Sequence, residues 1–205
     1  MAHGPRQKVW ELCKTDVDAA LDFARKIESP WDRTQALAIT ALHAPQKARF
    51  LKIVKEAFKV AHENRQPNRI VSCAAWIVWV VTKRNDVDVS PFVKELLEII
   101  KREPNPVRRA DALSLVFEAV YSRHELRSIV LTPLLQACCE MNSWKQPRIL
   151  SDIALVAAID DLPLANKVIE MIGDGSKKRQ TLKMVEKGEW LGAHEFFPHF
   201  AKTST

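Results

Sequence analysis

Glycine is nearly absent from most of this chain, and its absence constrains the fold more than any other feature of the sequence. The 205 residues include five glycines, and none lies between Gly4 and Gly173. Tight β-hairpin turns and phosphate-binding loops usually need glycine, because glycine adopts positive φ without steric cost. A long stretch without glycine that is rich in Ala, Leu, Lys, Arg and Glu therefore favours helices joined by short loops. It also excludes a Walker-type phosphate loop or a GxGxxG turn from most of the chain.

The prolines fit the same interpretation. Most of them fall between apolar segments, where proline can occupy the first turn of a helix without losing a hydrogen bond. These prolines are Pro30, Pro45, Pro67, Pro91, Pro104, Pro106, Pro133, Pro147 and Pro163. The longest apolar run, Ile70 to Val81, is shorter than the ~20 residues that span a bilayer, so it predicts a buried core helix and no membrane span.

A short pattern recurs five times along the chain. Each copy has an amphipathic segment, a brief break that usually contains proline, an arginine, and then a more apolar segment. The arginines are Arg33, Arg69, Arg109, Arg148 and Arg179, at spacings of 36, 40, 39 and 31 residues. A period near this length is typical of a two-helix repeat.

The repeat predicts an all-α fold, an α-solenoid of about ten helices in five antiparallel pairs that form a right-handed curved stack. We expect one helical-repeat domain over residues 1–205, with a C-terminal capping segment at 188–205 and no regular structure in residues 1–8. The predicted repeats are 16–45, 46–85, 90–123, 126–160 and 163–187.

The third unit, Leu96 to Leu113, resembles a HEAT repeat, which has a first helix, a proline-containing turn and Val-Arg-x-x-Ala at the start of the second helix. The resemblance covers roughly residues 16–187. It implies that the turn arginines form a ladder with acidic or amide residues of neighbouring units, for which Asp32 and Asn105 are candidates. The tetratricopeptide pattern fits less well, since its glycine and tyrosine positions are missing.

The turn arginines and two turn tryptophans are the candidate binding residues. A guanidinium can bind a phosphate or carboxylate of a partner, but recurrence at the repeat period favours a packing role between repeats. Trp31 and Trp144 flank breaks, where packing and partner binding are equally consistent with the sequence, whereas Trp76 and Trp79 are predicted to be buried. The candidate binding set is Trp31, Arg33, Arg69, Arg109, Trp144 and Arg148.

We expect no catalytic residues, no metal site and no cofactor. The segment from His194 to His199 resembles a zincin motif, but its histidines are five residues apart, about 140° around a helix, and Pro198 interrupts them. The four cysteines lack metal-ligand spacing and predict reduced, partly buried thiols in a cytoplasmic (intracellular) protein.

The function predicted from these features is a non-enzymatic scaffold that binds a protein or peptide. The net charge of +6 is spread along the chain and favours acidic partners. The alternative is a nucleic-acid-binding protein, since HEAT-like DNA glycosylases bind DNA in a basic groove with a catalytic aspartate; neither Asp111 nor Asp152 stands out for that role. The sequence indicates no membrane partner and leaves the oligomeric state open.

Overall fold

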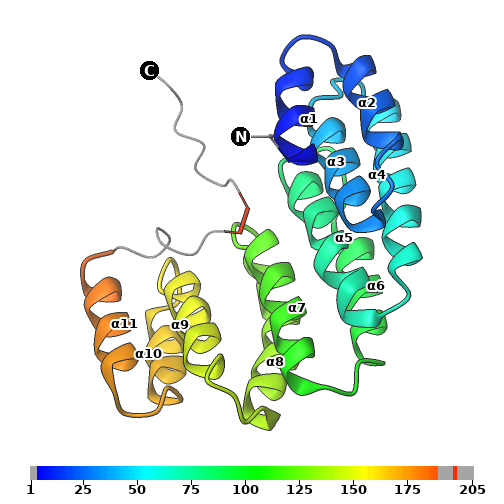
Figure 1. Ribbon diagram of the computed structural model, residues 1–205. Coiled ribbons are helices and arrows are strands. Elements are labelled where there is room, and N and C mark those ends of the chain that lie inside the picture. Colours follow the sequence, from blue (N-terminus) through cyan, green and yellow to red (C-terminus); the bar gives the residue numbers. More distant parts are fainter. Residues whose placement is uncertain (1–3, 189–195, 198–205) are drawn as a thin grey trace. The chain divides into compact units, whose positions relative to one another are not determined.

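The computed structural model describes residues 4–188 and 196–197, and every regular element within them is a helix (Figure 1). This confirms the predicted all-α class. The chain groups into two compact units, Met1–Glu103 and Pro104–Thr205. The expectation of a single domain stays a prediction.

The two units contain six and five α-helices among the described residues. The first unit contains α1 (Pro5–Cys13), α2 (Val17–Arg25), α3 (Pro30–Leu42), α4 (Lys47–Ala61) with a 3₁₀ turn at His62–Asn64, α5 (Pro67–Thr82) and α6 (Ser90–Ile100). The second unit contains α7 (Pro106–Ala119), α8 (His124–Glu140), α9 (Gln146–Ala157), α10 (Leu162–Glu170) and α11 (Ser176–Glu186). Each predicted repeat covers two successive helices, starting with α2 and α3, but the third, 90–123, is divided between the units, since α6 lies in the first unit and α7 in the second. The arrangement in five antiparallel pairs stays a prediction.

Helix α1 precedes the predicted repeats and was not expected. Residues 1–8 were predicted to lack regular structure, which is wrong from Pro5 onward. Proline suits the first turn of a helix, and Val9 and Cys13 are buried on one face of α1, which packs against α2 and α3. Few apolar positions mark this helix in the sequence, so its periodicity is weak.

Local sequence explains where the other helices begin and end. Four helices begin at a polar side chain that accepts hydrogen bonds from backbone N–H groups of the first turn. These residues are Asp16 for α2, Ser29 for α3, Asn105 for α7 and Asp161 for α10. Gly188 has φ of 67° just after α11, a conformation that glycine adopts readily at a helix C-terminus. Most prolines lie in first turns or loops as predicted, whereas Pro133 lies inside α8.

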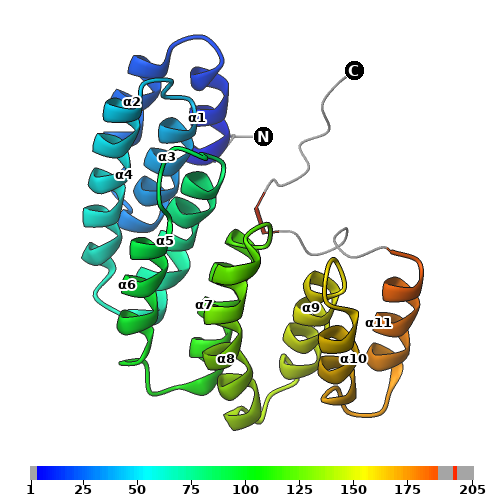
Figure 2. The ribbon, with the colours of Figure 1, turned by 180° about the vertical axis from the view of Figure 1, so that it is seen from behind.

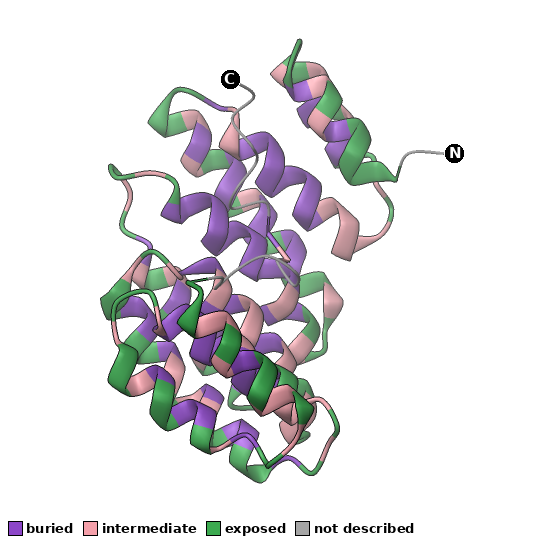
Figure 3. Cartoon of the chain, turned by 90° about the vertical axis from the view of Figure 1, so that its left-hand side faces the viewer, coloured by how far each residue is buried: buried purple, intermediate pink, exposed green. Residues whose placement is uncertain are grey.

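The core of the first unit is centred on α3 and α5. Helix α3 contacts α1, α2, α4 and α5, and α5 also contacts α4 and α6. Buried residues lie on the helix faces that pack together (Figure 3). Trp76 and Trp79 of α5 are buried, as predicted, with ring centroids 5.6 Å apart in an edge-to-face arrangement.

Helix α9 has the same central position in the second unit. It contacts α7, α8, α10 and α11 (Figure 2). Between α9 and α11, the Ser151 hydroxyl donates to the Thr181 hydroxyl at 2.7 Å, because Thr181 donates its own proton to the Lys177 carbonyl. Both side chains are fully buried, so this polar contact fixes how α11 packs on α9.

No helix in the described part of the chain has the length and apolar character that crossing a bilayer requires.

Candidate functional site

Arg33, in the first turn of α3, connects three segments of the first unit. One guanidinium nitrogen donates to the Ile27 carbonyl, which follows α2, at 3.2 Å. Another donates to the Glu63 carboxylate in the turn after α4. The arginine side chain is 20% exposed, so this contact is partly shielded from water. Arg33 therefore joins the C-terminal end of α2 to the turn after α4. These are equivalent positions in the first two predicted repeats.

Arg109 repeats this arrangement in the second unit. Its guanidinium donates to the Pro104 carbonyl, just before α7, at 3.3 Å and to the Glu140 carboxylate at the end of α8. Its side chain is also 20% exposed. Glu63 lies 30 residues after Arg33 and Glu140 lies 31 residues after Arg109, so both contacts follow the repeat.

These contacts give Arg33 and Arg109 a packing role inside the units. The sequence singled out Asp32 and Asn105 as ladder partners, whereas the ion pairs run to Glu63 and Glu140. Asn105 instead caps α7 by accepting the N–H groups of Val107 and Arg108. The missed signal was a carboxylate at the end of the following first helix, about 30 residues after the turn arginine.

The other turn arginines do not share this arrangement. Arg69 is exposed and forms no ion pair with any residue in the described ranges 4–188 and 196–197. Arg148 is 46% exposed and lies 3.7 Å from Asp111, whose other carboxylate oxygen accepts from Lys145 at 2.5 Å. Arg179 in α11 is exposed as well. Arginine therefore occupies this position in all five predicted repeats, but in only two of them, at Arg33 and Arg109, does it donate to both a carbonyl and a carboxylate of the described residues.

The two turn tryptophans also differ. Trp31 is half-buried in the first turn of α3. Trp144, between α8 and α9, is 80% exposed, the highest value among the exposed large apolar side chains of the described residues. An indole this exposed contributes little to the packing of its own unit.

Two cationic side chains follow Trp144 closely in the sequence and reach α7. Lys145 and Arg148 follow it at the start of α9, and both approach Asp111 of α7. Arg108, one turn before Asp111 on α7, is exposed. We call Trp144 with Arg108, Asp111, Lys145 and Arg148 the Trp144 surface. It combines an exposed aromatic ring with three cations and one anion.

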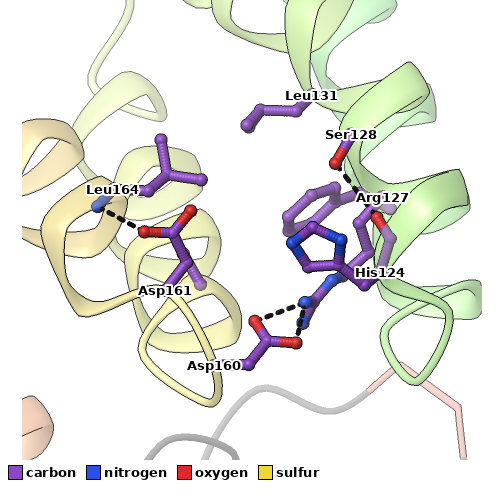
Figure 4. A pocket seen from close by; sticks show the side chains of 9 residues that line it. His124, Arg127, Ser128, Leu131, Asp160, Asp161 and Leu164 are labelled. Atoms are coloured by element: carbon purple, nitrogen blue, oxygen red, sulfur yellow. Dashed lines mark hydrogen bonds and ion pairs between the residues drawn. The ribbon is translucent and has the colours of Figure 1, made fainter.

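A small pocket of about 90 Å³ lies elsewhere in the second unit, between α8 and the start of α10 (Figure 4). The buried Arg127 guanidinium donates to both carboxylate oxygens of Asp160 and to the Val156 carbonyl. Asp161 accepts the Leu164 N–H, and the Ser128 hydroxyl donates to the His124 carbonyl. These polar groups already serve the fold, so the pocket offers neither a free nucleophile nor a free anion-binding arginine.

The thiols are consistent with a packing role. Cys13, Cys73 and Cys138 are buried and Cys139 is exposed, and all four are free. Burial raises the pKa of Cys73 to about 11 and that of Cys138 to about 12, so neither is a nucleophile near neutral pH. Across the described residues, no three His, Cys, Asp or Glu side chains form a group that would hold a metal ion. His194 and His199 lie outside those residues.

No protein-family model, curated protein or solved structure matches this chain. The likeness to HEAT repeats therefore rests on the residues themselves.

Proposed function

We propose that this chain is a non-enzymatic, HEAT-like interaction module in which five antiparallel helix pairs form a right-handed solenoid that binds a protein or peptide. The shared contacts of Arg33 and Arg109 support the repeat, because two equivalent residues join equivalent positions of successive pairs.

The exposure of Trp144 is the observation that carries the binding role. Tryptophan and arginine are the side chains that contribute most often and most strongly to protein interfaces. Trp144 exposes 80% of its surface, and Lys145 and Arg148, which follow it in the sequence, both reach Asp111, one turn from the exposed Arg108 on α7. The Trp144 surface as defined carries three cations and one anion, so we expect the partner to present an acidic surface with a pocket or flat apolar patch for the indole.

Affinity capture from the source lysate tests this proposal. The full-length chain is the bait, with and without nuclease, and Trp144→Ala is compared with Ile129→Ala, which removes another exposed apolar side chain. We expect a protein that survives nuclease treatment and is lost with Trp144→Ala but kept with Ile129→Ala. Equal recovery by all three baits would contradict a role for Trp144, and the absence of any specific partner would contradict the module itself.

The same surface gives one reason to keep nucleic acid as the second candidate. An exposed indole can stack on a base, and neighbouring arginines can bind phosphates. Binding of a fluorescent single-stranded oligonucleotide, measured between about 50 and 200 mM salt, distinguishes the nucleic-acid role from the protein-binding role. Phosphate contacts predict a steep loss of affinity as the salt concentration rises. Loss of that binding in Arg108→Glu would support the nucleic-acid role, whereas binding too weak to detect at low salt would exclude it.

We also propose a cytoplasmic location. The four free cysteines support it, because oxidising compartments favour disulfide formation. The measurement is the location of a tagged full-length chain in the source cell.

A further inference from the structure

Glu118 holds a segment of the chain that lies almost eighty residues further along the sequence. One carboxylate oxygen accepts the backbone N–H of Phe196 at 2.8 Å and that of Phe197 at 2.9 Å. The Phe197 side chain is 1% exposed. The two-residue segment lies beside the end of α7 (Figures 1 and 2). A distant segment is thus held both through its backbone and through a buried aromatic ring.

The position of Glu118 is unfavourable for α7 alone. It lies in the last turn of a helix that ends at Ala119. The C-terminal end of a helix carries partial negative charge, so a carboxylate there destabilises the helix. Two backbone N–H groups on one oxygen offset that repulsion, because hydrogen bonds to a charged acceptor are among the strong ones. The segment therefore gives Glu118 a role that the helix does not.

Glu118 recognises a specific feature of a short segment, only two residues long. This recognition requires two successive N–H groups that reach one oxygen, and an aromatic side chain on the second residue. The backbone bends at both phenylalanines, which allows their successive N–H groups to face one oxygen, and Pro198 follows Phe197 in the sequence. Phe196 packs edge-to-face on Phe197, with centroids 5.1 Å apart. Another chain with an aromatic-aromatic-proline segment presents the same groups.

We propose that Glu118 and the space filled by Phe197 form a binding site for a bent aromatic-aromatic-proline peptide, and that the chain's own Phe196–Phe197 segment occupies this site until a partner peptide displaces it. We call it the Glu118 site. The inference rests on the proposed function and names one ligand class for it. Nine residues, 187–195, connect the segment to the end of α11, so a partner must compete with a tethered segment at high effective concentration.

Fluorescence anisotropy with a labelled peptide of residues 192–201 tests the site on the full chain. In the variant Phe197→Ala the tethered segment lacks its anchor, so we expect the peptide to bind this variant at least tenfold more tightly than the unmodified chain. A peptide with alanine at position 197 should not bind. Adding Glu118→Ala to Phe197→Ala should remove binding, whereas adding Glu125→Ala, an exposed carboxylate of α8, should leave it unchanged.

Circular dichroism of each variant ensures that a loss of binding is not a loss of folding. If the helical Phe197→Ala variant does not bind the peptide, or if Glu118→Ala leaves binding unchanged, the inference is wrong. Equal binding to the unmodified chain and to Phe197→Ala would overturn the occupancy by the chain's own segment. A captured partner that requires Trp144 but is insensitive to Glu118→Ala and to excess peptide would overturn this inference while leaving the proposed function intact.

Discussion

The turn before α3 and the turn before α9 have the same pattern in the sequence but different surroundings in the structure. In the first, Trp31 is half-buried and Arg33 binds both the Ile27 carbonyl and Glu63. In the second, Trp144 is 80% exposed and Arg148 makes only a long contact to Asp111. The difference shows that the arginine at this position packs where a carboxylate lies within hydrogen-bonding reach, as Glu63 does for Arg33. It stays exposed where the nearest carboxylate is already held by another cation, as Asp111 is by Lys145. There the same residue is available to a partner.

Arg127→Ala should have the largest effect on stability, because Arg127 is buried. It therefore adds a buried arginine to the comparison. The substitution leaves the Val156 carbonyl and Asp160 without their donor. Breaking a buried ion pair costs about 3–5 kcal/mol, but the Asp160 side chain is 41% exposed and regains water. We therefore expect a loss of about 2–3 kcal/mol in the free energy of unfolding, measured by urea denaturation.

Arg127→Met is the matched control for packing, since methionine keeps most of the aliphatic stem. It should lose nearly as much as Arg127→Ala if the hydrogen bonds dominate. A loss below 0.5 kcal/mol for both, as at an ordinary surface site, would show that burial does not decide what an arginine contributes here.

Arg109→Ala and Arg69→Ala compare the two uses of the repeat position directly. Arg109 donates to a carboxylate and to a carbonyl from a side chain that is 20% exposed. We expect Arg109→Ala to lower the free energy of unfolding by about 1–2 kcal/mol. Arg69 is exposed and forms no ion pair with the described residues, so Arg69→Ala should change it by less than about 0.5 kcal/mol. Equal losses in urea denaturation would contradict the distinction.

These turns also show which parts of the structure the sequence predicts. Apolar periodicity and first-turn prolines predict helices in the regions of α2 to α11, because both signals are local. The partners of Arg33 and Arg109 could not be read in the same way, since Glu63 and Glu140 are brought near only when helices pack. The contact of Glu118 with Phe196 and Phe197 could not be predicted either, because it joins residues 78 and 79 positions apart in the sequence. The exposure of Trp144 could not be predicted either, because it depends on whether other helices pack over the indole.

A double-mutant cycle on Arg33 and Glu63 sharpens the comparison by isolating one contact. Single changes also disturb the Ile27 carbonyl contact, but the cycle measures only the coupling between the two charged side chains. Glu63 is 47% exposed, so the coupling should be about 0.5–1 kcal/mol and should fall with added salt. The same cycle on Arg69 and Glu63 is the control and should give no coupling. Coupling of equal size in both cycles would indicate a general charge effect instead of a specific contact.

Arg148→Ala should have the smallest effect on stability, although Arg148 occupies the same repeat position as Arg33 and Arg109. Its guanidinium lies 3.7 Å from Asp111, beyond hydrogen-bonding distance, and Lys145 keeps its 2.5 Å contact with the same carboxylate when Arg148 is removed. We expect a change of less than about 0.5 kcal/mol in urea denaturation, with any partner that requires Trp144 bound more weakly. A loss as large as that of Arg109→Ala would place Arg148 among the packing arginines and remove it from the Trp144 surface. A small loss with unchanged partner binding would leave Trp144 as the anchor and restrict the charge contribution to Arg108 and Lys145.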